Sequence, residues 1–583
     1  MRRSLPLPLL CALLCAALAG CASIPTSGAV RQGQDLRVER QDDAVAFIAD
    51  GPVEGATAAQ VVQGFLAAGA DFRNDHEVAR EYLTDRAAQS WRPGAGTVVH
   101  DGGAPPVVED QGDGSVVARA TEVARIDDEG SYQRTPGLPE ISRGFRVERQ
   151  DGEWRIAELD DGLLLSQLDV SQAYRPVSLY FLSPTRNSLV PDTVLVPELA
   201  GLPTKVVGRL LRGPTAALRG AVLTGFPQGT NLEVQSVPVS DGLATVPLTE
   251  EALSADQDAR EQMSAQIVWT LKQLGSEIER VRITAGGDDL VVAGVAQDQA
   301  RNSWLTYDPD GLGSSASVYA VRDGVVGRII EGAFQPVVGP AGTGDPPLRS
   351  PAVSLDTTEV AAVSPDGRTL RVGRLAADGD LEVVLTGDDL SPPSWDPLGN
   401  LWVVDRSTDR VLLLPGGSGP AVQVETPALP GGRPTAIAVS RDGARAALVA
   451  GRGQGARLVL GAVTGLEGLE PDATGTPRVA IESVREVLPG ARAVRDVAWS
   501  NATTLTVLGS LDGSPVAPFT TSTDGYQIVT VEPETDLATV AAAPLSAESG
   551  PLVAGTSDGQ LVQFTSGRGW VPLGAGSDPA YPG

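Results

Sequence analysis

A strand–turn–strand pattern recurs through the C-terminal half of this chain. Two copies are clear, at residues 362–370 and 438–446, where an apolar strand enters a Ser-x-Asp-Gly turn and a second apolar strand leaves it. Proline after the serine and glycine in the fourth position suit a type I turn. Fainter copies of the same pattern lie at residues 394–399, 498–501 and 556–559.

This repetition, together with the near absence of helical periodicity, predicts an all-β propeller over residues 301–583. At about 40–45 residues for each four-stranded blade, the region has room for six or seven blades. The turns are unevenly spaced, with 32 residues from Gly367 to Gly399 and 44 from Gly399 to Gly443, so both blade numbers stay open.

Residues 45–172 predict a small α+β domain. Thr57 and Gln60 have the form of a capping box, and apolar residues at helical spacing follow them. A second helix is expected to start at Asp75, with His76 on its exposed side. Strands are expected at 115–126, 145–150 and 153–159. Helices followed by a curved antiparallel sheet resemble the NTF2-like cone.

The last two of these strands are joined by Asp-Gly, a dipeptide typical of two-residue hairpins. In the register that such a turn sets, Val147 lies opposite Ile156 and Glu148 lies opposite Arg155. This pairing places an apolar side chain against an apolar one and an acid against a base.

Residues 173–300 predict a second α+β domain. A hairpin of residues 231–239 and 243–248 carries Pro238 and Pro247, which favour the edge of a sheet. The strongest helical pattern of the chain follows, beginning near Ser254 and ending at Gly275. Further elements are expected as strands at 177–182 and 281–284 and a short helix at 204–212.

The first 20 residues have the organisation of an export signal. Arg2 and Arg3 precede an apolar segment, residues 5–17, which is too short to remain as a transmembrane helix. The segment runs into Leu-Ala-Gly-Cys, the lipobox of bacterial lipoprotein precursors. Small side chains fit the peptidase cleft, and only a thiol at the next position can take the diacylglyceryl thioether.

We therefore predict that residues 1–20 are a lipoprotein signal peptide and that Cys21 carries S-diacylglycerol and an N-palmitoyl chain. The residues expected to be recognised by the signal peptidase are Leu18, Ala19 and Gly20. The alternative is an ordinary secretory signal that leaves Cys21 as a free thiol.

Cysteine content and charge agree with a lipid anchor. Cys11 and Cys15 lie inside the predicted signal, so Cys21 is the one cysteine expected in the mature chain. The formal net charge of −28 repels phosphate backbones and anionic headgroups, which excludes nucleic acid as a partner and leaves lipid as the means of membrane attachment. We expect residues 21–44 to be a tether and the following domains to lie at the outer face of the cytoplasmic membrane.

The sequence predicts no catalytic residue, cofactor or metal site. The two histidines, His76 and His100, are expected at solvated surface positions, and residues 308–311 are expected to form a turn, although they hint at a calcium loop. Paired carboxylates are the remaining enzymatic option, and we expect these pairs in solvated loops. They are Asp127-Asp128, Asp160-Asp161, Asp288-Asp289 and Asp388-Asp389.

The three predicted domains behind a lipobox resemble the LpqB family of actinobacterial lipoproteins. In the first domain the matching stretches are residues 62–66 and 79–84, ending at Trp91. The second domain is similar to the GerMN module of sporulation and germination proteins, and the third to the propeller of the family. The stretches that resemble GerMN are 179–181, 210–214, 242–246 and 267–271.

The resemblance implies a non-enzymatic accessory protein of the MtrA–MtrB two-component system. Its partner would be the extracytoplasmic domain of the sensor histidine kinase MtrB, and its role would lie in cell-wall homeostasis and division. Two alternatives stay open: a structural lipoprotein of envelope assembly, and a cell-wall glycan hydrolase or lyase that uses paired carboxylates. The sequence names no small-molecule ligand.

Overall fold

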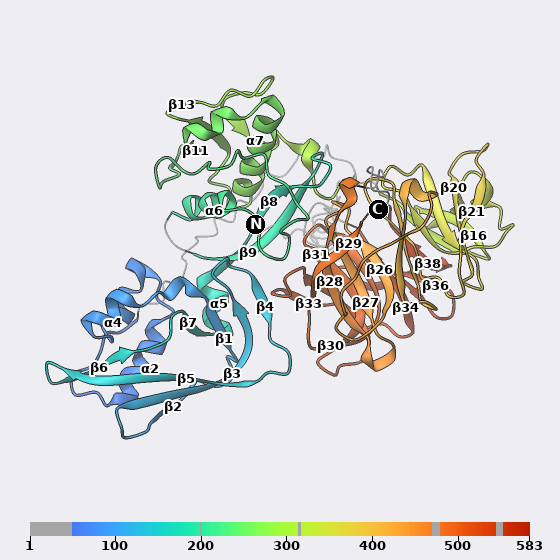
Figure 1. The fold of residues 1–583 in the computed structure, drawn as a ribbon. Coiled ribbons are helices and arrows are strands. Elements are labelled where there is room, and N and C mark those ends of the chain that lie inside the picture. The colour runs from blue at the N-terminus through green and yellow to red at the C-terminus, as the bar shows by residue number, and fades with distance from the viewer. Residues whose placement is uncertain (1–48, 199–200, 313–315, 469–477, 544–551) are drawn as a thin grey trace, which may run out of the picture. The chain divides into compact units, whose positions relative to one another are not determined.

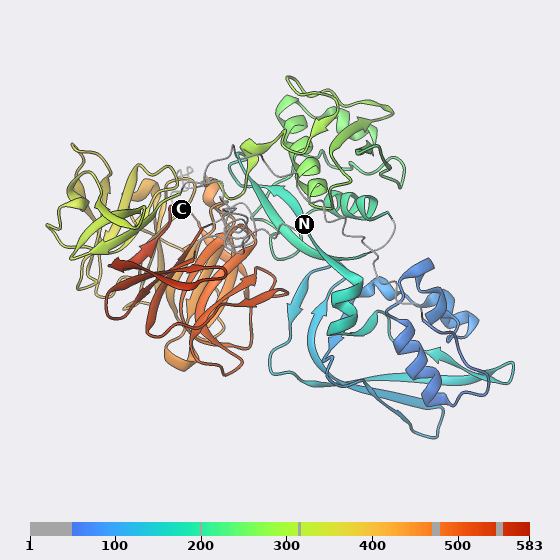
Figure 2. The same ribbon diagram turned by 180° about the vertical axis from the view of Figure 1, so that it is seen from behind.

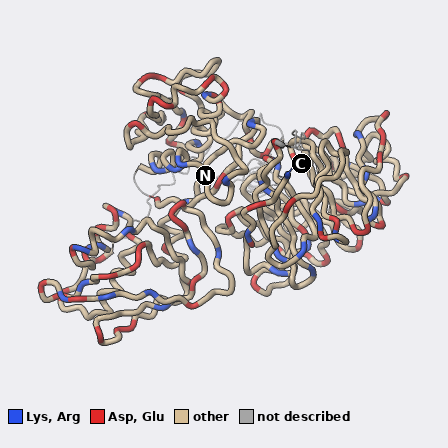
Figure 3. The backbone as a smooth tube through the Cα atoms, in the orientation of Figure 1, with Lys and Arg blue, Asp and Glu red and all other residues tan. Residues whose placement is uncertain are grey.

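The computed structural model describes residues 49–198, 201–312, 316–468, 478–543 and 552–583. The predicted signal peptide, the lipobox, Cys21 and the whole predicted tether lie outside these residues. Within the described ranges, no helix combines the length and the apolar character needed to cross a bilayer. Acidic and basic residues are interspersed along each domain (Figure 3).

The first domain packs helix α2 (Ala58–Ala68) against a strongly curved sheet that is antiparallel except where β1 pairs with β7 in parallel (Figures 1 and 2). The capping box is confirmed: the Thr57 hydroxyl accepts the N–H of Gln60, and the Gln60 side chain accepts the N–H of Thr57. Val61, Val62 and Phe65 are buried as the spacing predicts. The domain is α+β, and its likeness to an NTF2-like cone stays a prediction.

The sheet has the order β6-β5-β3-β1-β7, with β2 and β4 paired to β3. Strand β3 spans the predicted residues, and the hairpin register is confirmed, with Val147 opposite Ile156 and Glu148 opposite Arg155. The strand bounds are β1 Thr97–His100, β2 Val107–Asp110, β3 Ser115–Ile126, β4 Tyr132–Arg134, β5 Glu140–Gln150, β6 Glu153–Glu158 and β7 Leu163–Ser166. The remaining helices are α3 Glu77–Arg80, α4 Asp85–Ser90 and α5 Gln167–Ala173.

The predicted helix from Asp75 is wrong in its start and its length. Asn74, Asp75 and His76 have φ values of 47°, 58° and 59°, which lie in the left-handed region, so a right-handed helix cannot pass through them. Only one helical turn, α3, follows. His76 is turned inward as a consequence.

The second domain is built around helix α7 (Gln257–Lys272), which connects β11 (Leu243–Leu248) to the parallel strand β12 (Arg280–Ala285). Such a crossover buries the helix on the sheet. Its N-cap is Asp256, two residues after the predicted Ser254. The other elements are β8 Tyr174–Leu182, β9 Leu189–Pro197, α6 Leu202–Leu211, β10 Val239–Ser240, β13 Asp288–Asp289 and β14 Gln299–Ala300.

The predicted hairpin strand over residues 231–239 is shorter in the structure. Val239 and Ser240 pair with β11 as the two-residue strand β10, which forms the edge of the sheet. Pro238 and Pro247 have no N–H to donate, so the ladder is interrupted beyond this pair, and the predicted strand meets β11 again at the isolated bridge between Leu232 and Leu248.

The third domain consists of six four-stranded antiparallel sheets in the described residues, one of the two predicted blade numbers. Strand β38 (Ser577–Ala580) pairs with β15 (Val318–Arg322), so the last strand of the chain completes the first sheet and closes the ring. The six sheets in order are β38-β15-β16-β17, β18 to β21, β22 to β25, β26 to β29, β30 to β33 and β34 to β37.

The innermost strands of these sheets contact one another in sequence around the ring. They are β38, β18 (Arg349–Val353), β22 (Ser394–Trp395), β26 (Pro434–Val439), β30 (Ala491–Asn501) and β34 (Leu537–Ala542). The outer strands are β16 Val325–Ile330, β17 Ala333–Pro336, β19 Glu359–Val363, β20 Thr369–Arg374, β21 Leu381–Thr386, β23 Leu401–Asp405, β24 Arg410–Leu414, β25 Val422–Gln423, β27 Arg445–Ala450, β28 Arg457–Thr464, β29 Ala480–Glu486, β31 Thr504–Leu511, β32 Ala517–Ser522, β33 Ile528–Thr530, β35 Leu552–Thr556, β36 Gln560–Thr565 and β37 Gly569–Ala575.

The repeated turn is held by its own side chains. The Ser364 hydroxyl donates to Asp366 at 2.5 Å and accepts the N–H of Thr369 at 2.9 Å. The turn at Ser440 and Asp442 makes the same pair of contacts. Turns of this kind occur at different places in the blades, between second and third strands at 364–367 and between inner and second strands at 440–443, which explains their uneven spacing.

Buried tryptophans join neighbouring blades. The indole N–H of Trp395, which is fully buried, donates to the carbonyl of Ala352 at 3.1 Å, and that of Trp499 donates to Ala438 at 3.0 Å. Each bond links the inner strand of one blade to the inner strand of the blade before it. A buried carbonyl left without its donor is destabilising.

We expect Trp395→Phe to lower the free energy of unfolding by about 1–3 kcal/mol for the unpaired carbonyl of Ala352, in addition to a cavity term. Trp570→Phe is the matched control, because its indole donates to the carbonyl of Glu532 at an exposed position where water can replace it. Urea denaturation measures both. An equal loss in the two variants would contradict the bridging role of Trp395.

Candidate functional site in the propeller channel

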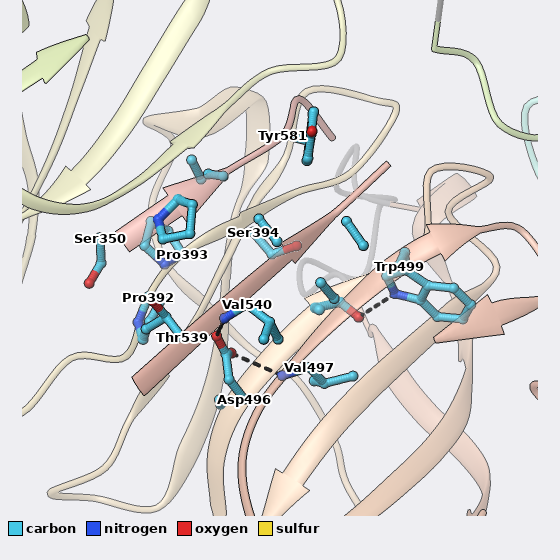
Figure 4. Close-up of a pocket in the computed structure, with 18 of the residues that line it drawn as sticks. Ser350, Pro392, Pro393, Ser394, Asp496, Val497, Trp499, Thr539, Val540 and Tyr581 are labelled. Atoms are coloured by element: carbon cyan, nitrogen blue, oxygen red, sulfur yellow. Dashed lines mark hydrogen bonds between the residues drawn. The ribbon is translucent and has the colours of Figure 1, made fainter. Parts of the chain in front are cut away.

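A cavity of about 130 Å³ lies on the axis of the propeller, between the six inner strands (Figure 4). Alanine and proline side chains form much of its wall, because small residues let six strands approach one axis. The ionisable side chains that line it are Arg441, Asp496, Asp578 and Tyr581. The cavity therefore combines apolar walls with a few charged groups, which is typical of small-molecule sites.

Asp496 lies in the middle of β30, where the pairing with β31 is irregular between Arg492 and Asp496. Its two carboxylate oxygens accept the N–H groups of Val497 and Val540, both at 2.9 Å (Figure 4). The carboxylate thus joins β30 to β34 and faces the cavity. Burial, with a smaller contribution from the nearby Asp578, raises the pKa of Asp496 to about 7.

Asp578 lies on β38 and lines the same cavity. The hydroxyl of Ser350 donates to one of its oxygens at 3.2 Å, and the hydroxyl of Ser577 donates to the other at 2.8 Å. Its φ of 48° is left-handed, a conformation that aspartate and asparagine adopt more readily than most residues. Two carboxylates from different blades therefore face one cavity.

Arg441 lies at the other end of the cavity, in the turn after β26. Its guanidinium donates to the carbonyls of Pro582, Trp499 and Ala542 at 3.1, 3.0 and 3.2 Å, and so connects three segments of the ring. Burial lowers the pKa of Arg441 to about 10, so the side chain stays charged at neutral pH. Arg441 binds the carbonyl of Trp499, which follows Asp496 by three residues on β30. The level of Asp496 and the level of Arg441 along the axis are therefore about 10 Å apart.

The predicted surface positions of the histidines are wrong. His76 and His100 are 5% and 6% exposed. The His76 ring lies 4.6 Å from that of Phe72 and 5.8 Å from that of Trp91, and burial lowers its pKa. His100 ends β1, as predicted, and its Nδ1 contacts the carbonyl oxygen of Asp101 at 2.8 Å. Both histidines belong to the first domain rather than to the propeller cavity.

The paired carboxylates lie at exposed or half-buried positions, and none lines the cavity; the prediction of loops is wrong for Asp288 and Asp289, which form β13. Asp161 pairs with Arg92 at 2.6 Å and Asp389 with Arg406 at 3.2 Å. Residues 308–311 form a bend in which Asp310 accepts the N–H of Ala502 at 2.7 Å. In the part of the chain that the structure describes, no group of three His, Cys, Asp or Glu residues is arranged to hold a metal.

Sequence reasoning missed Asp496, Asp578 and Arg441. A signal for Arg441 was present, because it occupies the position in the repeated turn that Pro365 occupies in another copy. Asp496 follows Arg495 in an inner strand of mixed apolar and charged residues, where it gives no distinct signal. Asp578 follows no pattern in the sequence, and only ring closure brings it to Asp496.

Three family models match successive parts of the chain. Residues 51–171 match the model described as "Lipoprotein LpqB, N-terminal domain", residues 178–291 match "Sporulation and spore germination", and residues 323–582 match "Lipoprotein LpqB beta-propeller domain".

Two similar relatives cover almost the whole length. Lipoprotein LpqB of Thermobifida fusca is 32% identical, with 98% of this chain and 98% of the relative covered. Lipoprotein LpqB of Streptomyces coelicolor is 33% identical, with 97% and 96% covered. Among solved structures, TolB from Acinetobacter baumannii is similar with a TM-score of 0.35 at 15% identity, covering 46% of this chain and 66% of TolB.

The raised pKa of Asp496 predicts how stability changes with pH. A carboxyl whose pKa is higher in the folded state than the ordinary value near 4 binds its proton more tightly when folded. Its contribution to stability is therefore complete below about pH 4 and is lost as the pH rises through 7. We expect the free energy of unfolding to fall between pH 5 and pH 8, and to fall less in Asp496→Asn.

Urea denaturation of both proteins at pH 5.0, 6.5 and 8.0 measures this difference. Burial also raises the pKa of Asp310, to about 6. Asp310 therefore lowers the free energy of unfolding with rising pH by the same amount in both proteins, and the difference between the proteins reports on Asp496. Parallel curves for wild type and Asp496→Asn would contradict the assignment.

Proposed function

Because the chain belongs to the LpqB family of lipoproteins, we propose that it is a lipid-anchored, non-enzymatic accessory protein of a sensor histidine kinase. The partner is the extracytoplasmic domain of MtrB, and the process is cell-wall homeostasis and division. The observation that carries this proposal is the similarity to proteins named lipoprotein over 98% of both chains.

The anchor follows from the same relationship. Cys21 ends the lipobox, and two or more acyl chains give stable attachment, since each buried methylene contributes about 0.8 kcal/mol. The formal charge of −28 makes attraction to anionic headgroups unfavourable, which leaves the lipid as the means of attachment. The folded domains then lie at the outer face of the cytoplasmic membrane, where the sensor domain of a kinase also lies.

The size of the propeller cavity supports binding over glycan hydrolysis. Asp496 and Asp578 are carboxylates that face one space, as a glycosidase requires, but a cavity of about 130 Å³ is comparable to one that admits a single benzene. A cell-wall glycan chain needs an open cleft with room for several sugar rings. The carboxylates therefore suit a small ligand better than a polysaccharide.

An accessory protein changes signalling only through differential affinity. A sensor kinase has at least two states, and a partner shifts their populations by the ratio of its affinities for them. The propeller and the GerMN domain offer extended surfaces for such contacts. A tenfold shift in the kinase equilibrium requires a difference of about 1.4 kcal/mol in binding free energy.

We expect Cys21→Ala to leave the precursor unacylated and uncleaved by the lipoprotein signal peptidase, because the alanine has no thiol. Cys15→Ala is the matched control, since that cysteine lies within the signal, and it should be processed normally. Mass spectrometry of the N-terminal peptide distinguishes the products. A normally acylated, cleaved Cys21→Ala product would refute the assignment of the lipidation site.

Deletion of the gene that encodes this chain should change the level of MtrA phosphorylation in the native bacterium. Complementation with the gene should restore the original level. Phosphate-affinity gel electrophoresis of MtrA measures this directly. Envelope defects with unchanged MtrA phosphorylation would favour a structural role instead. Release of glycan fragments by the purified protein, lost on replacing one carboxylate, would favour a hydrolase.

A further inference from the structure

The contact that Asp496 makes between two blades of the propeller does not require a charged side chain. Asp496 links β30 to β34 by accepting the N–H of Val540. At another blade junction the hydroxyl of Ser394 on β22 does the same by accepting the N–H of Val439 on β26, at 3.0 Å. A neutral acceptor is therefore sufficient to join two blades.

Two other buried aspartates of the propeller have a local structural explanation. Asp396 accepts the indole N–H of Trp402 at 2.9 Å, and Asp442 forms an ion pair with Arg445 within a turn. Asp496 lies in a strand rather than a turn, and its partners among the described residues are two backbone N–H groups. Asp496 and Asp578 both line the cavity.

The positive end of the cavity limits what can bind there. The guanidinium of Arg441 is held by three carbonyls, so it stays in place whether or not a ligand is present. Arg441 disfavours a second positive charge at this end, and the nearby carboxylate of Asp310 offsets part of that repulsion. The rest of the lining is mostly apolar, with Ala436, Ala438 and Pro393 among its residues, and it includes the hydroxyl groups of Ser350, Ser394 and Thr539. A single cationic head with a short apolar stem satisfies both ends.

The volume sets the size of such a ligand. An apolar cavity of about 150 Å³ accommodates benzene, so about 130 Å³ accommodates five or six non-hydrogen atoms. Peptides and nucleotides exceed this size. An ammonium group is compact and supplies three N–H donors, which suits two carboxylates that face one space.

We propose that the propeller channel binds a small primary ammonium compound, with its ammonium group at the carboxylates of Asp496 and Asp578 and its apolar stem directed toward Arg441. This goes beyond the proposed partnership with a sensor kinase and does not depend on it. Occupancy of the axis by a small metabolite would make the state of the propeller sensitive to the chemical surroundings of the envelope.

The test is a titration of the full-length protein, in deuterated detergent at pH 8, with n-butylammonium, followed by saturation-transfer difference NMR. The neutral isostere 1-butanol is the ligand control, and we expect it to bind at least tenfold more weakly. Equal binding of the two compounds, or no binding of n-butylammonium, would overturn the proposal.

Asp496→Asn should weaken n-butylammonium binding at least tenfold, while Asp378→Asn, which removes one exposed charge of the same domain, should leave it unchanged. Near-UV circular dichroism checks that each variant is folded. If Asp496→Asn does not fold, Asp578→Asn is the second variant, because asparagine tolerates the left-handed backbone there and still accepts the Ser350 hydroxyl. Unchanged binding in whichever channel variant folds would contradict the assigned site.

Lowering the pH from 8 to 5.5 should weaken binding about tenfold or more, because Asp496, with its pKa raised to about 7, becomes protonated. The charged groups that face it are Asp578 on β38 and Arg406 in the turn after β23, and Arg441 lies across the cavity. Equal affinity at both pH values would exclude Asp496 as the group that holds the ammonium ion.

Discussion

Closure of the propeller ring by β38 is the interaction on which the third domain depends. An open ring would leave β15 as an exposed edge and would separate β38 from β18 and β34. Pairing of β38 with β15 costs the closure of a very long loop, but this entropic cost grows only slowly with length. The contacts around the closed ring then fix all six inner strands at once.

The same contacts that close the ring also place the charges of the channel. The Asp496 carboxylate joins two blades, the Arg441 guanidinium joins three segments, and Asp578 enters the cavity on the closing strand itself. Charged groups fixed in this way lose little entropy when a ligand binds, which is the usual advantage of preorganisation. The carboxylates lie at one end of the cavity and Arg441 lies at the other, so a polar ligand would bind in one orientation.

Local rules predicted much of the fold from the sequence. The capping box at Thr57, the hairpin that pairs Val147 with Ile156 and the extent of β3 each depend on a few neighbouring residues, and each was found in the structure. The position of His76 was predicted wrongly because three consecutive residues in the left-handed region break a helical pattern that composition alone supports.

The channel could not be predicted because its residues come together only in the closed ring. Asp496 and Asp578 lie 82 positions apart in the sequence, and neither belongs to a motif. The blade number was open for a related reason: the Ser-x-Asp-Gly turn stabilises any tight connection between strands, so it marks turns without marking blades. Cys21, in contrast, is predicted from local sequence alone, and it lies outside the described residues.

Crosslinking in intact cells is the most direct test of the proposed contact with the sensor kinase. Photoreactive residues placed on the surfaces of the GerMN domain and the propeller of the lipidated protein would capture its neighbours at the membrane, and mass spectrometry would map the linked residues. We expect crosslinks to the extracytoplasmic domain of MtrB that cluster on one surface. Crosslinks to other envelope components alone, with none to the kinase at any surface position, would contradict it.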